Sequence, residues 1–343
     1  MLGITALMGV GALAVAGCSS SSTSASPAKP GKVPLVVYSA QGYDKAMTQA
    51  FQKATGIPVK LDDNSTGPLL TQIEASKNNP NWGLLWVDGA TAFAGLDQQG
   101  LLLKGFTPTV TWDSLGTASV PADHSYVPTG VTLMAALVYN KTKVAAPPAT
   151  WQQLLQPQWK GAIGMNDPSQ SGPTYPFIAG MMSYLGGVPA GEQYFTKLKG
   201  NGLIIHPTNG PTLQALTSGQ IKLALVQSSA GIGAVLGDSK LTVKYLDPVT
   251  LLPSAIGIDA KAPAAEQAEA KKFIDFVLSP AGQKVMQSGD PTGDSLYYPV
   301  VQDVAPLAAL PPLTGVKTQS IDPYTWGTKE ASINTWFDSS IVR

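Results

Sequence analysis

The chain has 343 residues, of which 44% are hydrophobic and 13% charged, a length that suits one large domain or two lobes with separate cores. The chain has 22 basic residues (Lys and Arg) and 22 acidic residues (Asp and Glu), so its formal net charge is zero. It therefore lacks the basic excess of a nucleic-acid-binding protein. With a single cysteine, the fold cannot depend on an internal disulfide bond.

The first 32 residues are typical of a signal peptide followed by a tether. Residues 2–17 form an uncharged, mostly apolar run, too short for an ordinary transmembrane helix but long enough for a signal-peptide core. Small residues precede Cys18, and this resembles a bacterial lipobox, which implies a signal peptide over 1–17 and a lipid on the sulfur of Cys18. The rest of 18–32 is rich in Ser, Thr, Ala and Pro and predicts a flexible tether. The alternative is a buried apolar helix with an ordinary free cysteine.

From residue 33 the chain alternates short apolar runs with amphipathic ones. Strands are expected over Leu35–Ser39, Val59–Leu61 and Leu84–Val87. Helices are expected from about Tyr43 to Gly56, from Pro68, and from about Ala90. Because strand and helix alternate, we expect an α/β sandwich with a mainly parallel sheet.

The second half repeats this logic. Val131–Tyr139 is a long apolar run, expected to be a strand that leaves the first lobe. The later elements expected along the chain are helices over Tyr175–Leu185, Ala190–Leu198 and Thr212–Ser218, strands over Lys222–Val226 and Ala255–Ile258, and helices over Ala264–Leu278 and from Pro280. We therefore expect one lobe from 33–130 plus 254–343 and another from 131–253. Crossing strands near 130 and 253 would join them, as a hinge-bending clamshell requires.

Enzyme motifs are missing from the sequence. His124 and His206 are the two histidines, far apart and without metal-ligand spacing. No Gly-x-Ser-x-Gly elbow, phosphate-binding loop or dinucleotide fingerprint stands where it would be needed, and Gly231-x-Gly233 lacks a third glycine. The sequence therefore predicts a protein that is not an enzyme and carries no cofactor.

Polar segments follow the expected strands at the points where helices begin. Ligands of open α/β sheets bind outside the carboxyl ends of strands, where helix N-termini offer free N–H groups to anions. For any single segment the alternative is helix capping, since Ser, Thr, Asn and Asp are preferred caps. Six such segments in two lobes favour a shared cleft. The candidate ligand-binding residues are Ser39, Gln41, Gly42, Ser65, Thr66, Asp88, Ser169, Ser171, Gly172, Asn209, Ser228 and Ser229.

Between residues 33 and 300 the chain resembles the family-1 extracellular solute-binding proteins, in the branch of ferric-iron, thiamine, polyamine and phosphonate receptors. The segments that carry the resemblance are Leu35–Gln41, Phe51–Val59, Val138–Lys141, Trp159–Gly164, Leu213–Leu216, Ala270–Ile274 and Ser279–Gln283. The resemblance implies a type II periplasmic-binding-protein-like clamshell. It also implies a monomeric, lipid-anchored, extracytoplasmic receptor that delivers a small-molecule ligand to the permease subunits of an ABC importer.

The ferric branch fits this sequence poorly. Its members resembling this chain hold iron with two adjacent tyrosines after the strand that ends here at Val226, where this chain has Gln227-Ser228-Ser229-Ala230-Gly231. The loop that carries a histidine ligand in several members has Gly42. Asp88 falls where a family carboxylate ligand stands, but one carboxylate is a poor set for an ion that prefers several hard oxygens. We therefore expect no metal site, with Asp88 as the ligand if iron is bound.

The anion-binding loops of the family are better matched. Ser169–Gly172 and Asn209 stand where relatives hold a phosphate, carbonate or phosphonate at helix N-termini, although Pro173 removes one donor. With Asp88 opposite, a ligand with an oxyanion and an amine would fit, so we expect a phosphonate or another small organic anion.

Several aromatic residues are candidates for the site. Tyr43, Trp86 and Tyr126 could form its walls, although Trp86 in an apolar strand is more typical of a core, and Tyr38 and Tyr43 could add phenol oxygens if iron is bound. Two functions of other classes stay open. A secreted lipoprotein hydrolase would use Asp88 or Asp167, and an adhesive surface lipoprotein would have no cleft.

Overall fold

The structure, a computed structural model, describes residues 32–290, 294 and 296–343. The expected signal peptide, Cys18 and the tether up to residue 31 lie outside the described residues. The strands are β1 (Leu35–Ser39), β2 (Val59–Asp63), β3 (Leu84–Asp88), β4 (Val127–Asn140), β5 (Ile163–Asn166), β6 (Ile204–His206), β7 (Leu223–Val226), β8 (Leu241–Ile258) and β9 (Thr318–Gln319).

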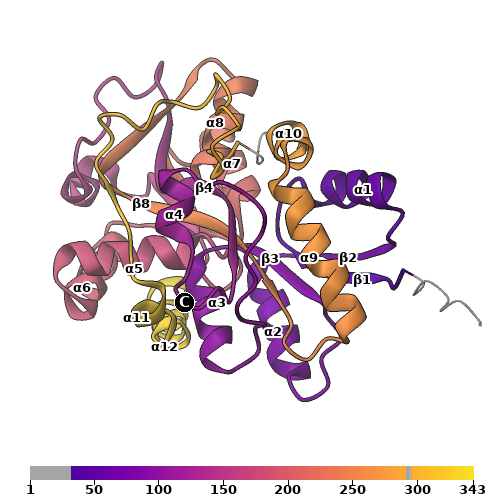
Figure 1. Cartoon of the computed structure of the whole chain (residues 1–343). Coiled ribbons are helices and arrows are strands. Elements are labelled where there is room, and N and C mark those ends of the chain that lie inside the picture. The colour runs from indigo at the N-terminus through magenta and orange to yellow at the C-terminus, as the bar shows by residue number, and fades with distance from the viewer. Residues whose placement is uncertain (1–31, 291–293, 295) are drawn as a thin grey trace, which may run out of the picture. The chain divides into compact units, whose positions relative to one another are not determined.

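Helices separate most of these strands (Figure 1). They are α1 (Asp44–Thr55), α2 (Thr66–Ser76), α3 (Ala90–Gln98), α4 (Ser114–Ser119), α5 (Thr174–Leu185), α6 (Val188–Gly200), α7 (Asn209–Ser218), α8 (Ser228–Gly237), α9 (Ala264–Leu278), α10 (Pro280–Ser288), α11 (Pro323–Gly327) and α12 (Glu330–Phe337). The short turns η1 (Trp151–Leu155), η2 (Pro157–Trp159) and η3 (Asp338–Val342) complete the described secondary structure.

The described strands form one mixed sheet in the order β2-β1-β3-β8-β4-β7-β5-β6, with β9 beside β8. β1 pairs in parallel with β2 and β3, and β5 pairs in parallel with β6 and β7. Between these two parallel sets run β4 and β8, which are antiparallel to each other and to their other neighbours, β7 and β3. Two β/α units are thus joined through the two longest strands.

Alternate residues of β3 point to opposite faces of the sheet, and helices cover both faces. Leu84 and Trp86 pack with α1 and α9, whereas Leu85 and Val87 pack with α2 and α3. All four side chains are fully buried, as expected for a parallel strand covered on both sides. Figure 1 shows the same arrangement, with α1 and α9 on one side of β1–β3 and α2 and α3 on the other.

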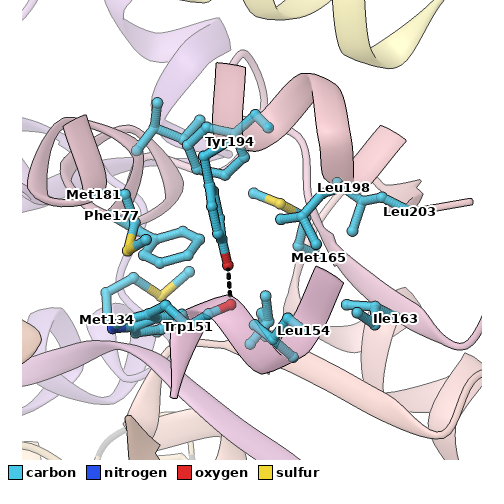
Figure 2. Packing of buried hydrophobic residues seen from close by; sticks show 14 of the residues in the cluster. Met134, Trp151, Leu154, Ile163, Met165, Phe177, Met181, Tyr194, Leu198 and Leu203 are labelled. Carbon is cyan, nitrogen blue, oxygen red and sulfur yellow. Dashed lines mark hydrogen bonds between the residues drawn. The ribbon is translucent and has the colours of Figure 1, made fainter. Parts of the chain in front are cut away.

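A second core forms around β5 and β7, where α5, α6 and η1 cover one face. Trp151 and Phe177 stack at a ring distance of 5.3 Å, and the Tyr194 hydroxyl donates to the Trp151 carbonyl oxygen at 2.7 Å (Figure 2). The C-terminal side chains Trp326, Phe337 and Ile341 belong to the same cluster.

The C-terminal segment contacts both halves of the described chain. Its α12 packs with the second core, but Tyr324 donates toward Asp97 and Asp123 at 3.3 Å each. The expectation placed all of 254–343 in the first lobe, and the division into two lobes with those boundaries stays a prediction.

The α/β class expected from the sequence is confirmed, and most element positions agree. Two strands are longer than expected, because β4 begins at Val127 and β8 begins at Leu241. The start of β8 contains Lys244, Asp247 and Pro248, which interrupt the apolar pattern used to recognise strands.

Candidate functional site

A cavity of about 370 Å³ lies where the carboxyl ends of six strands meet. Its lining comes from residues 40–42, 63–66, 88, 170–173, 208–210, 227, 294 and 297. Each of the six polar segments picked out from the sequence contributes at least one residue. The strands β1–β3 and β5–β7 run in opposite directions, because β8 and β4 lie between them and each pairing is antiparallel. The carboxyl ends of the two parallel sets therefore face each other at the cavity.

The candidate residues divide into two groups. Those that line the cavity are Gln41, Gly42, Ser65, Thr66, Asp88, Ser171, Gly172 and Asn209. Ser39, Ser169, Ser228 and Ser229 are not part of the lining, and their hydroxyl groups bond within the protein. Ser39 Oγ accepts from Gln41 N and Ser228 Oγ from Leu133 N, whereas Ser169 Oγ donates to Asp167 and Ser229 Oγ to Asp294.

Asp88 forms the floor of the cavity and is 6% exposed. Its Oδ1 accepts from Gln41 Nε2 at 3.1 Å, and its Oδ2 accepts from Gln227 Nε2 at 2.9 Å and from the Tyr297 hydroxyl at 2.8 Å. Burial raises the pKa of Asp88, although these three donors act against the shift. All three are uncharged, so the carboxylate is held by hydrogen bonds alone.

The carboxylate also fixes the orientation of the Gln41 amide. Since Nε2 donates to Asp88, the other end of the amide is the acceptor Oε1. This oxygen is buried and has no hydrogen-bond partner in the described part of the chain. A buried acceptor without a partner costs free energy unless something donates to it.

Asp294 is a second carboxyl group at the cavity, and the sequence did not single it out. It accepts from Ser229 Oγ at 2.8 Å, which lowers its pKa, but burial and the charges of Asp88 and Asp290 raise the pKa to about 7. The lining contains three aspartates, the third being Asp63, and its described residues include no Lys, Arg or His. The electrostatic field of these side chains therefore disfavours a bare anion at the floor.

Helix N-termini supply positive partial charge at the cavity, opposite in sign to the aspartates. Helices α2, α7 and α8 begin at residues of the lining or directly beside it, and α5 begins directly after Pro173. None of these four has a side-chain hydrogen bond at its N-cap, a feature that they share with α1, α3, α6, α9 and α12. By contrast, α4, α10 and α11 are capped by Asp113, Ser279 and Asp322. The first-turn N–H groups of α2, α7 and α8 are thus left open at the cavity, together with the positive ends of their helix dipoles. In α5 the first N–H group, that of Thr174, donates to Ser171 O at 3.0 Å.

A buried amide positions two of the candidate residues. Asn166, at the end of β5, donates from Nδ2 to Asn209 Oδ1 at 2.7 Å and to Ser171 Oγ at 3.3 Å, and its Oδ1 accepts from Thr212 at 2.6 Å. The Ser171 hydroxyl group therefore accepts a hydrogen bond from the protein, and its own proton can be donated to a ligand in the cavity. Asn209 Oδ1 also accepts from Gln227 N, and a hydrogen bond from the Asn209 side chain acts to lower the pKa of Asp294.

The aromatic candidates lie elsewhere. Tyr43 and Trp86 are fully buried and pack edge to face with rings 5.1 Å apart, and Tyr38 donates to Asn81. Tyr126 lines a different cavity, so the tyrosine in the lining is Tyr297. It stands in the apolar run Leu296–Val301, which is typical of a buried segment and gave no sign of a binding residue.

No group of three or more His, Cys, Asp or Glu residues in the described chain is placed to hold a metal ion. Burial and the nearby carboxylates of Asp88 and Asp294 hold the pKa of Tyr297 well above its ordinary value. The phenol thus stays protonated and donates to Asp88.

Comparison with known proteins identifies the family. A family model described as bacterial extracellular solute-binding protein matches residues 46–314, most of the chain. The chain belongs to this family. Among curated relatives, this solute-binding protein is 25% identical over 242 residues to a Salmonella typhimurium protein assigned as a 2-aminoethylphosphonate-binding periplasmic protein, with 68% of each chain covered. It is 24% identical over 319 residues to the major ferric iron-binding protein of Neisseria meningitidis, covering 88% of this chain and 92% of the relative.

A solved structure supports the fold of this solute-binding protein. The periplasmic binding protein AfuA from Actinobacillus pleuropneumoniae, with exogenous fructose-6-phosphate bound, aligns with a TM-score of 0.79 and 20% identity over 91% of this chain and 99% of that chain. The expected type II clamshell class is thus confirmed. Among the described residues, no helix combines the length and apolarity needed to cross a membrane.

Proposed function

We propose that this solute-binding protein is the receptor of an ABC importer and captures a small oxyanion-bearing solute, such as a phosphonate or another small organic anion. In this proposal the ligand binds between two lobes, 33–130 plus 254–343 and 131–253, and passes to the permease subunits. The receptor acts outside the cytoplasm as a monomer, held at the membrane by the lipid on Cys18.

One observation carries the anionic part of the proposal. Four helices begin around one cavity without side-chain caps, and the hydroxyl group of Ser171, which accepts from Asn166, can still donate there. Uncapped N–H groups at helix starts favour a phosphate, phosphonate or carboxylate. Pro68, Pro173, Pro176 and Pro211 lack an N–H group, so the donors come from the residues around them.

The floor favours a second feature of the ligand. Asp88 and Asp294 lie beside the unpartnered acceptor Gln41 Oε1, and no lining cation neutralises them. A hydroxyl or ammonium group could donate to these oxygens while the oxyanion contacts the helix starts. An aminoalkylphosphonate combines both groups, and the Salmonella typhimurium relative is assigned to such a compound.

Calorimetric titration of the full chain with three compounds tests this function. We expect 2-aminoethylphosphonate to bind most tightly, ethylphosphonate to bind at least about tenfold more weakly, and ethylamine not to bind, because the helix starts supply the main attraction. Binding of ethylamine without binding of either phosphonate would contradict the proposal.

Ferric iron is the second candidate, because Asp88, Asp294 and Tyr297 offer three hard oxygens in one place. The relative from Neisseria meningitidis is a ferric iron-binding protein. The Tyr297 hydroxyl donates to Asp88 at 2.8 Å, so iron bound to this oxygen would have to displace the proton and break that hydrogen bond.

A further inference from the structure

Two glycines pack against the opposite side of the cleft at one rim of the cavity. Gly67 is the second residue of α2, and a Cβ built on it would lie 1.9 Å from the carbonyl oxygen of Ser169. A Cβ built on Gly172 would lie 2.5 Å from Thr66 Oγ1 and 2.7 Å from Thr66 Cβ. Neither glycine has a positive φ, so close packing and not backbone conformation requires them.

The Ser169 carbonyl cannot easily give way. Asp167 Oδ1 accepts from both the N–H and the hydroxyl of Ser169 at 2.8 Å, and Asp167 O accepts from Ser171 N at 2.9 Å. Asp167 N in turn donates to His206 O at 2.8 Å. This turn is therefore rigid, and a side chain on Gly67 must push the whole of α2 away from it.

We propose that Gly67 and Gly172 are positioning residues that allow the cleft to close on its ligand, an inference that rests on the proposed receptor function. Thr66 and Gly67 belong to one proposed lobe, and Ser169 and Gly172 belong to the other. At other points around the cavity the two lobes meet through hydrogen bonds, from Gln227 to Asp88 and from Ser229 to Asp294. At this rim the two lobes are in close contact because Gly67 and Gly172 have no side chains to hold them apart.

The physical consequence follows from the contact distance. Contacts of a real Cβ lie at 3.0 Å or more, so alanine at position 67 must separate the two sides by about 1 Å. Donors from α2 and α5 then cannot both lie within about 3.2 Å of one oxyanion. The fraction of molecules in the closed form falls. Because the ligand binds the closed form, its apparent affinity falls in the same proportion.

The test compares Gly67→Ala with Gly95→Ala, a matched control in α3. A Cβ on Gly95 meets nothing within 4 Å, and both substitutions replace glycine by a better helix former. Spin labels on Glu74→Cys in α2 and Lys197→Cys in α6, in a Cys18→Ser background, report the separation of the two sides. The distance is measured without ligand and with 2-aminoethylphosphonate, beside a titration with the same compound.

Of the two conditions, without and with ligand, one gives the shorter α2–α6 distance in the parent protein. In that condition we expect Gly67→Ala to lengthen the distance, and we expect it to weaken binding at least about tenfold. Gly95→Ala should match the parent in both measurements. Equal distances and affinities for the two variants would overturn the inference. A parent that does not bind any of the phosphonates contradicts the proposed function instead, and the distance comparison still decides the role of Gly67.

A second pair keeps the test decisive if Gly67→Ala fails to fold. Gly172→Ala alone should lengthen the distance, because its methyl group meets Thr66 Oγ1, Cβ and Cγ2 at 2.5–2.8 Å. Thr66→Gly removes all three atoms. The double variant Thr66→Gly, Gly172→Ala should therefore recover the short distance, and a double variant as long as Gly172→Ala would overturn the inference.

Discussion

Helices α10 and α7 each have a hydroxyl residue at the N-cap but differ in how their first turns are satisfied. Ser279 precedes Pro280, and its Oγ accepts from Gly282 N at 3.2 Å, which closes the start of α10. Thr208 stands at the same place before α7, but its side chain makes no capping bond. Asn209, the next residue, is held by Asn166 and lines the cavity.

The difference shows that a polar residue before a helix has two possible uses. A side-chain cap contributes about 1 kcal/mol to stability. The four helix starts at the cavity lack that contribution, and the first-turn N–H groups of α2, α7 and α8 stay available. Capping therefore does not account for the polar residues around the cavity, although it was the stronger alternative for each of them taken alone.

The largest effect on stability is expected at Asp88, a strand-end residue whose carboxylate accepts three hydrogen bonds from the protein. Asp88→Ala leaves the buried donors of Gln41 and Tyr297 without their acceptor and removes one of the acceptors of Gln227. Because each unsatisfied buried group costs about 1–3 kcal/mol, we expect the free energy of unfolding to fall by about 3 kcal/mol or more, measured by urea denaturation. Asp63→Ala is the control, since Asp63 is exposed at the same cavity and should change stability by less than about 0.5 kcal/mol. Similar losses for both variants would contradict the assigned network.

Ser171 and Ser279 test the contrast directly. Ser171→Ala should lose about 1.5–3 kcal/mol of affinity for 2-aminoethylphosphonate if its free proton meets a charged oxygen, and leave the ligand-free melting temperature almost unchanged. Ser279→Ala should do the opposite, with about 1 kcal/mol of stability lost and binding as in the parent. A calorimetric titration and a melting curve separate the two results. A Ser171→Ala protein that melts early but binds normally would make Ser171 an ordinary structural residue.

The sequence predicted the class of fold and the six segments that meet at the cavity, because hydrophobic periodicity and strand-end position are local signals. It did not separate Ser171, which lines the cavity, from Ser229, whose hydroxyl donates to Asp294, since that depends on neighbours distant in sequence. Asp294 and Tyr297 were missed for a similar reason. They lie outside regular helices and strands, and only the tertiary structure brings them to Asp88.

The start of a third helix, α1, predicts that the stability of the fold depends on pH. Asp44 is in the first turn of α1 and is buried, and burial raises the pKa of its carboxyl group to about 7 although Ser39 lowers it. Between about pH 4 and 7 the folded chain keeps a proton that the unfolded chain has lost. Stability from this group is therefore greatest at low pH, and it is lost as the pH rises through this window.

We expect Asp44→Asn to reduce the decrease in unfolding free energy between pH 5 and 7 by about 1–2 kcal/mol, measured by urea denaturation at each pH. Asp113→Asn at the start of α4 is the control, because that residue is a capping side chain at a helix start away from the cavity. An unchanged pH profile in Asp44→Asn would show that Asp44 titrates normally.

The last prediction is that adding ferric citrate produces no new absorption band. If the oxygens at the floor are used by the fold, ferric citrate should produce no visible tyrosinate charge-transfer band, since Tyr297 donates its proton to Asp88 and its pKa is well above the ordinary value. A site that holds iron would have to remove that proton and break the bond to Asp88. A band that appears in the parent, survives in Tyr38→Phe and disappears in Tyr297→Phe would place iron at the cavity and reverse the order of the two candidates. No band at neutral pH, together with phosphonate binding, would leave Tyr297 as a donor that holds Asp88 in place.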